Sequence, residues 1–231
     1  MPSISFKSLP SDYQEILSAF RQRISQNEKY VIDFENRHYN SIQELTVIYC
    51  FRHAIDLAKG CLVTAGAELP DSLTILCRAM MDTLFWTKYI SLSTEYAQKF
   101  ADSTLDELKR IARKNIEAGY AHITDLNSDD DKTTEALNSP SMKDIPKRIG
   151  IEDVAKQGGL ESLYTRFYGF QSIIVHGRGF SLPREASNND EFYTSISFAL
   201  GMLECIEVIA SDWIISRQQT TEKTLFRLLG I

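Results

Sequence analysis

Long stretches of this sequence repeat apolar residues with the spacing of an α-helix, and none alternates apolar and polar residues over a useful length. Residues 72–90 (SLTILCRAMMDTLFWTKYI) are apolar nearly all round, and residues 41–66 begin with the S-x-x-E pattern of a helix capping box at Ser41 and Glu44. Apolar residues three and four apart share one helix face, whereas a half-buried strand needs strict alternation. The chain is therefore predicted to be all-α.

The helical pattern covers most of the chain and fails over one segment. Helices are predicted over residues 11–26, 41–66, 72–90, 93–123, 160–176, 191–219 and 221–230. Between about residues 124 and 159, turn residues and acids replace the helical period, which predicts a long surface connection holding one or two short helices. We predict a single-domain helical bundle of about six or seven helices over residues 1–231, with this one long, partly structured connection.

The charge balance and the cysteines exclude several classes of protein. The chain carries 25 Lys and Arg against 31 Asp and Glu, a formal net charge of −6, so any RNA contact has to be local rather than the effect of a global positive field. The cysteines, Cys50, Cys61, Cys77 and Cys205, lie far apart in apolar runs, which favours buried reduced thiols over disulfides or zinc ligands. We expect a cytoplasmic protein with no cofactor, no metal and no membrane-spanning segment.

An arginine and an aspartate lie one helical turn apart inside the most apolar segment. Arg78 and Asp82 in CRAMMD share one helix face, and the surrounding residues offer little solvated surface. An unpaired buried arginine or aspartate costs several kcal/mol, about 3 or more, so each needs a partner. The partner is either the other member of the pair or a group from another helix.

A stripe of uncharged polar residues begins at Tyr168. Tyr168, Ser172 and His176 recur every four residues in the apolar run YGFQSIIVHG, and Arg178 follows shortly after. Hydroxyls and an imidazole need hydrogen bonds but tolerate burial, and a helix C-terminus favours the protonated form of a histidine such as His176. The stripe is either a buried network that fixes helix packing, with Tyr168 bonded to Asp82, or one wall of a site for acid–base chemistry.

At these residues the sequence resembles the bacterial domain-of-unknown-function family five-six-seven-seven. Its members typically show an apolar helix with an arginine followed by an acidic residue, and a later helix with the pattern Tyr-x3-Ser-x3-His-Gly. Arg78 and Asp82 match the first helix, with aspartate in place of the more usual glutamate, and the run that begins at Tyr168 matches the second. The resemblance covers roughly residues 45–180. It implies a helical fold in which these residues act together, and it implies no particular activity.

A more distant similarity is to the HEPN helical ribonucleases, whose motif places an arginine a few residues before a histidine in one helix. The arginines nearest to His176 here are Arg166, ten residues before it, and Arg178, two residues after it. The similarity therefore implies catalysis of that kind only if Arg78 or Arg178 supplies the missing positive charge.

Two functions from different classes remain open. The first is a non-catalytic binding or assembly module in which the polar cluster specifies helix packing. The alternative is a metal-independent ribonuclease. In that enzyme His176 is the acid or base, Arg78 or Arg178 neutralises the phosphorane, and Tyr168 and Ser172 orient the phosphate while Asp82 holds Arg78. Bacterial defence or stress response is the expected setting. A protein partner is also expected, with a homodimer predicted because residues 197–215 are apolar on more than one helix face.

Overall fold

The structure is a computed structural model that describes residues 11–35, 41–125, 127–128, 130–146, 149–168 and 189–229, with the side chains of the last helix described from Tyr193 to Trp213. Over these ranges the regular elements are helices, accompanied by turns and an isolated bridge between Thr124 and Asp131. The all-α prediction is confirmed.

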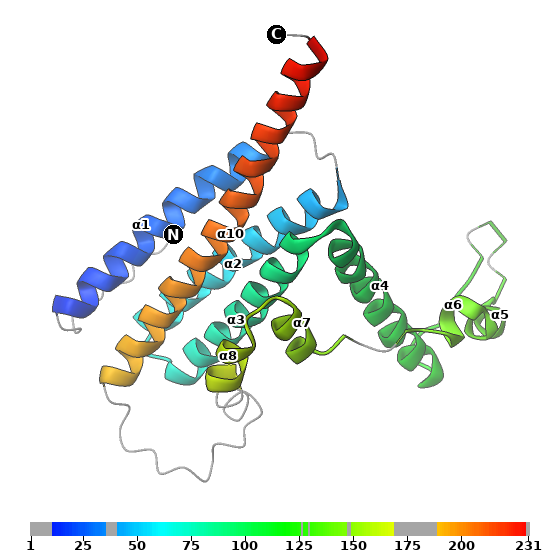
Figure 1. The fold of residues 1–231 in the computed structure, drawn as a ribbon. Helices are drawn as coiled ribbons and strands as arrows, with labels where there is room; N and C mark the ends of the chain where they lie inside the picture. Colours follow the sequence, from blue (N-terminus) through cyan, green and yellow to red (C-terminus); the bar gives the residue numbers. More distant parts are fainter. Residues whose placement is uncertain are drawn as a thin grey trace. The chain divides into compact units, whose positions relative to one another are not determined.

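Four long helices form the bundle: α1 (Ser11–Glu35), α2 (Ile42–Gly66), α3 (Pro70–Leu92) and α10 (Asn189–Leu229). The helix α3 packs against α2 and α10, α10 also packs against α2, and α1 packs against α2 and α10 (Figure 1). The core side chains that they bury completely or almost completely include Leu17, Phe20, Phe51, Leu73, Met80, Phe85, Tyr89, Leu203 and Ile206. Burial of one helix stripe against the others is the main source of stability for such a fold.

The local signals read from the sequence set several helix boundaries. The Ser41 hydroxyl accepts a hydrogen bond from the Glu44 backbone N–H at 3.1 Å, as the capping-box pattern predicts. The helix α2 ends at Gly66, and Pro70 occupies the first turn of α3, where its missing N–H costs nothing. These boundaries agree with the predicted ones to within two residues.

The last helix differs from the prediction. Residues 189–229 form one α-helix of 41 residues, so the separate short helix predicted over residues 221–230 was wrong. The polar residues near position 220 include no glycine or proline, and without such a residue the helical hydrogen bonds continue unbroken. Three of the cysteines are buried as predicted, whereas Cys205 is exposed on α10.

In the part of α10 whose side chains are described, Tyr193–Trp213 is long and apolar enough to cross a membrane by length and composition alone. Such a test is weak evidence, because the core helix of a soluble protein also passes it. Ile196, Leu203 and Ile206 are 0% exposed in the bundle. The bundle buries 33% of this apolar stretch, and the homodimer predicted from it stays untested.

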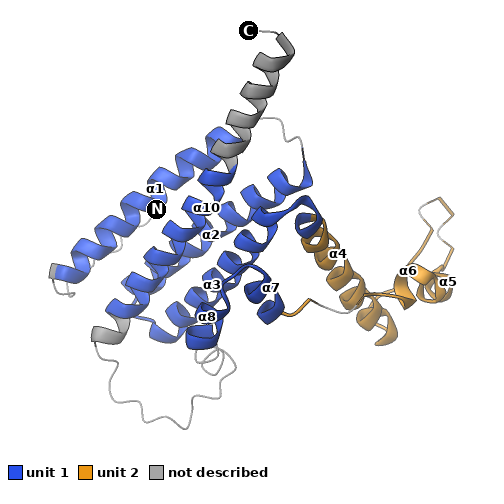
Figure 2. Ribbon diagram, viewed as in Figure 1, with its two compact units in different colours: residues 1–97, 151–231 blue, residues 98–150 orange. Residues whose placement is uncertain are grey.

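The contacts divide the chain into two compact units, residues 1–97 with 151–231, and residues 98–150 (Figure 2). The first unit holds the bundle together with α7 (Ile151–Gln157), α8 (Glu161–Leu163) and a π-helix (Tyr164–Tyr168). The second holds α5 (Thr133–Asn138), α6 (Pro140–Lys143) and, from Gln98 onward, α4 (Thr94–Glu117). The described ranges thus contain nine α-helices, more than the predicted six or seven because of the short ones. The single-domain description stays a prediction.

Asn27 is a buried polar residue of α1 whose replacement tests the packing of the bundle. It is 0% exposed, and neither of its amide atoms has a hydrogen-bond partner in the described structure. Leucine has the same branching without the polar atoms, so Asn27→Leu is expected to raise the free energy of unfolding by about 1 kcal/mol. Urea unfolding measures the change, with Gln26→Leu at the neighbouring exposed position as the control. A less stable Asn27→Leu protein would contradict the prediction.

Candidate functional site

Three of the six predicted site residues are described, and the structure brings all three together. Arg78 and Asp82 lie one turn apart on α3, and Tyr168 is the last residue of the π-helix. The other three, Ser172, His176 and Arg178, lie outside the described residues. The candidate site is therefore built here from α3 and the π-helix, both of which belong to the first unit.

Arg78 and Tyr168 make two kinds of contact. The Arg78 Nη2 donates a hydrogen bond to the Tyr168 hydroxyl oxygen. The guanidinium carbon Cζ also lies 3.9 Å from the centroid of the Tyr168 ring, which is a cation–π distance. Tyr168 is only 6% exposed, so both contacts are largely shielded from water. A contact of this kind joins two segments that are 90 residues apart in the chain.

Aromatic side chains surround this contact. The ring centroids of Tyr164 and Tyr168 lie 4.7 Å apart with planes 26° from parallel. Phe85, which is 0% exposed on α3, lies 6.2 Å from the Tyr164 ring and 6.0 Å from the Tyr168 ring. Aromatic rings at such distances stabilise one another beyond their buried area. The result is a three-ring layer of Phe85, Tyr164 and Tyr168, with Arg78 against one of its rings.

The carboxyl group of Asp82 is destabilised in its charged form by burial. Burial raises the pKa of its carboxyl group, and the positive charge of Arg78 and an interaction with the Tyr168 hydroxyl only partly offset that effect. Asp82 Oδ1 and Arg78 Nε are both buried without a hydrogen-bond partner among the described residues. In the described part of the chain the site therefore holds one unused acceptor and one unused donor.

The hydroxyl of Tyr168 is a neutral group in this setting. Burial raises its pKa to about 12, and the Arg78 side chain acts in the opposite direction. A phenol with such a pKa stays protonated near neutral pH, so it can donate and accept hydrogen bonds but does not serve as a base. Its role in this arrangement is to position other groups.

The short helix α7 precedes α8 and the π-helix in the chain and packs against the same helix, α3, that carries Arg78 and Asp82. Val154 and Ala155 of α7 are 0% exposed. At the end of α7, a Cβ atom added to Gly158 would lie 3.4 Å from the Lys88 side chain and 3.2 Å from the Val154 carbonyl. A glycine therefore suits this turn, from which α8 and the π-helix continue. π-Helical turns are rare and frequent at functional sites.

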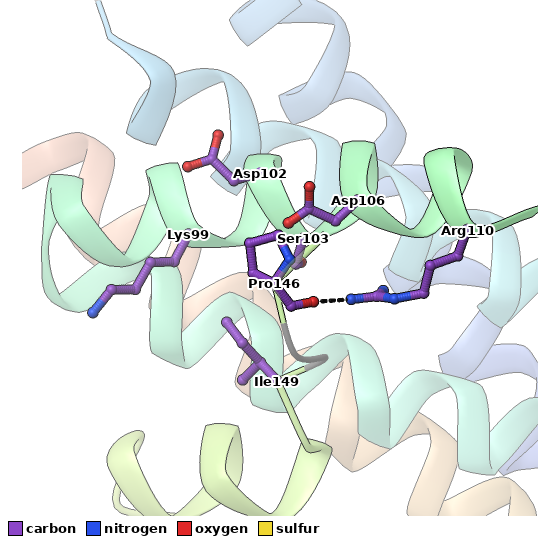
Figure 3. A pocket seen from close by; sticks show the side chains of 7 residues that line it. All are labelled: Lys99, Asp102, Ser103, Asp106, Arg110, Pro146 and Ile149. Atoms are coloured by element: carbon purple, nitrogen blue, oxygen red, sulfur yellow. Dashed lines mark hydrogen bonds between the residues drawn. The ribbon is translucent and has the colours of Figure 1, made fainter. Parts of the chain in front are cut away.

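A cavity of about 190 Å³ lies in the second unit and is lined by other residues. Figure 3 shows four residues of α4 that line it, Lys99, Asp102, Asp106 and Arg110, together with Pro146, whose carbonyl Arg110 contacts. Asp106 pairs with Lys109 at 3.4 Å, and Arg110 donates to the Pro146 carbonyl. Charges of both signs line this cavity and several are already paired, so it offers no strong preference for an anion or a cation.

Sequence reasoning missed two members of the first site and one contact in it. The phenol was predicted to bond Asp82, with which it does interact, but it also accepts a hydrogen bond from Arg78 that was not predicted. Phe85 gave no signal that separates it from an ordinary core residue. Tyr164 did give one, because it lies four residues before Tyr168 and extends the four-residue spacing of the polar stripe toward the N-terminus.

Comparison with known proteins gives one match. A family model described as "Family of unknown function (DUF5677)" matches residues 44–193, which cover α2, α3, the π-helix and the start of α10. This span contains Arg78, Asp82 and Tyr168 as well as the undescribed Ser172 and His176. No curated protein and no solved structure matches the chain. The similarity to the HEPN ribonucleases stays a prediction.

Proposed function

This chain belongs to the DUF5677 family of unknown function, and we propose that it is a non-catalytic helical binding or assembly module. In this proposal the cluster of Arg78, Asp82 and Tyr168, completed by Phe85 and Tyr164, specifies how the π-helix segment packs on α3. The expected setting is bacterial defence or stress response.

The observation that carries the proposal is that the guanidinium group of Arg78 is already engaged by its own chain. One face lies over the Tyr168 ring and Nη2 bonds the Tyr168 hydroxyl. An arginine that neutralises a phosphorane has to present its donors to the phosphate. Here those contacts would have to be broken first, so the geometry favours a packing role over a phosphate-binding one.

The state of Asp82 also supports a packing role. Asp82 Oδ1 has no hydrogen-bond partner among the residues that the structure describes, and the burial of this carboxyl group is an energetic cost that a simple apolar core would avoid. Although burial of polar groups costs free energy, it can favour one arrangement of helices over its alternatives. A unique orientation of the π-helix on α3 is what a module that presents a defined surface to a partner requires.

One observation favours the metal-independent ribonuclease as a second candidate. Arg78, Asp82 and Tyr168 meet at the residue from which the chain enters the segment that carries Ser172 and His176. In this second proposal His176 is the general acid or base, Ser172 orients the phosphate and Arg78 or Arg178 supplies the positive charge.

Cleavage of a labelled RNA pool separates the two proposals. The full chain and its His176→Ala variant are compared with a chelator present, after circular dichroism has shown that both are folded. We expect the same RNA pattern from both proteins, because the proposed module has no catalytic histidine. Cleavage by the unmodified chain that falls by about 10² or more in His176→Ala would overturn the proposed module in favour of the enzyme.

A further inference from the structure

Part of the polar face of α4 contacts residues 142–146 of the second unit, whereas an apolar stripe of the helix is exposed. Leu105, Leu108 and Ile111 are 53%, 60% and 50% exposed, whereas Asp106 is only 9% exposed. The polar face of α4 lines the cavity of Figure 3. Arg110 donates to the Pro146 carbonyl there, and Arg113 Nη1 donates to the Met142 carbonyl at 3.2 Å. Arg110 and Arg113 of α4 thus make their contacts within the chain, and the apolar stripe of the helix remains exposed to solvent.

An exposed apolar stripe of this size needs an explanation. Leu105, Leu108 and Ile111 are three residues apart and therefore form one ridge along the helix. Each large apolar side chain kept in water forgoes the stabilisation of burial, and contiguous apolar patches rimmed by charges mark surfaces that meet another protein. The stripe is flanked on one side by Glu107 and Lys114.

We propose that α4 pairs in antiparallel fashion with α4 of a second copy of this chain. In a two-fold arrangement centred near residue 110, Leu108 lies opposite Ile111 of the second copy, and Leu105 lies opposite Ala112 of the second copy. The same register places Glu107 opposite Lys114 of the second copy. Each contact occurs twice, because the two-fold axis repeats it.

Charge complementarity selects a second copy as the occupant. Glu107 and Lys114 lie seven residues apart on the same side of the apolar stripe, so an antiparallel copy presents the opposite charge to each of them. A parallel copy would place Ala112 across from Glu107, so neither Glu107 nor Lys114 would meet an opposite charge on the second copy. The apolar ridge and the flanking charges therefore agree on one orientation and one register.

This inference deepens the proposed assembly role by naming the partner, and it rests on that proposal. Its surface lies on α4 between Leu105 and Lys114, and none of its residues belongs to the Arg78 cluster. Loss of RNA cleavage in His176→Ala would overturn the proposed module, but it would not affect the dimeric mass that sedimentation measures. A monomeric protein would overturn the α4 pairing and leave the cluster intact, so the two failures are distinguishable.

Sedimentation velocity of the full chain tests the pairing. We expect twice the mass of the 231-residue chain at micromolar concentration. Leu108→Lys is expected to raise the dissociation constant of the dimer at least about tenfold, because it places two ammonium groups in the apolar contact. Val208→Lys is the matched control, since Val208 is 56% exposed on α10, the helix from which a dimer was predicted by sequence. Circular dichroism checks that each variant is folded.

A charge swap tests the register. Glu107→Lys is expected to weaken the dimer, because it sets like charges opposite each other at both ends of the contact, and adding Lys114→Glu is expected to restore it. Glu107 also bonds Arg110 within the chain at 2.9 Å, and the double variant does not remake that bond. Restored association would therefore come from the contact between copies. The proposal would be overturned if the unmodified chain were monomeric or if only Val208→Lys abolished dimerisation. It would also be overturned if the double variant dimerised as weakly as Glu107→Lys.

Discussion

Replacing Asp82 with alanine is expected to lower the free energy of unfolding by about 3 kcal/mol, and replacing it with asparagine is expected to cost far less. Alanine removes the carboxyl group that lies beside the half-buried Arg78 and interacts with the Tyr168 hydroxyl, and it leaves a space there. Asparagine keeps the shape and a neutral acceptor, which resembles the protonated carboxyl that burial already favours. Urea unfolding of the two variants beside the unmodified chain measures the difference.

The pH dependence of this comparison has a defined sign. The pKa of Asp82 is raised in the folded protein above its ordinary value of 3.8. A raised carboxyl pKa contributes stability that is present below the unfolded pKa and lost as the pH rises through the folded pKa. The unmodified chain should therefore gain stability relative to Asp82→Asn as the pH falls from 7 toward 3.8. An advantage that grows with rising pH, or an Asp82→Ala cost below about 1 kcal/mol, would argue against the buried cluster.

Truncation of Tyr168 to alanine is expected to cost about 4 kcal/mol, the usual range for a buried aromatic ring. The ring is 6% exposed, stacks on Tyr164 and lies beneath the Arg78 guanidinium. Tyr168→Phe keeps the ring and removes only the hydroxyl, which accepts from Arg78 Nη2 and interacts with Asp82, so it is expected to cost about 1 kcal/mol. Thermal and urea unfolding of both variants separate the contribution of the ring from that of the hydroxyl.

The control for this series is Tyr120→Phe, because Tyr120 is 85% exposed and loses a hydroxyl that faces water. Its effect is expected to stay within about 0.5 kcal/mol. Equal losses in Tyr168→Phe and Tyr168→Ala would mean that the hydroxyl rather than the ring holds the site together. A Tyr168→Phe protein as stable as the unmodified chain would mean that the hydrogen bond from Arg78 contributes nothing.

The sequence predicted which residues form the candidate site better than it predicted the contacts between them. A charged pair inside an apolar helix identified Arg78 and Asp82, because such groups are costly to bury without a partner. The four-residue spacing identified Tyr168. The sequence could not show that Tyr168 accepts its bond from Arg78, since that depends on the rotation of the π-helix on α3. Helix propensity and period do not encode that rotation.

Local sequence determined the helical class and most helix boundaries. Ser41 caps α2, Gly66 ends it and Pro70 begins α3 because each acts on the backbone hydrogen bonds of its own turn. The same local rules failed at the end of the chain, where polar residues were taken for a break that α10 does not have. A break requires a residue that disrupts the helix, and polarity alone does not disrupt it.

The tertiary structure decided which face of each helix is buried. The sequence shows that α4 is amphipathic, and an amphipathic helix ordinarily buries its apolar side. In the structure, hydrogen bonds from Arg110 and Arg113 to the Pro146 and Met142 carbonyls turn part of the polar side toward the chain, and Leu108 is left exposed. Periodicity determines that two faces exist, because it follows from the geometry of one helix. Only contacts between segments distant in the chain determine which face meets the protein and which meets water.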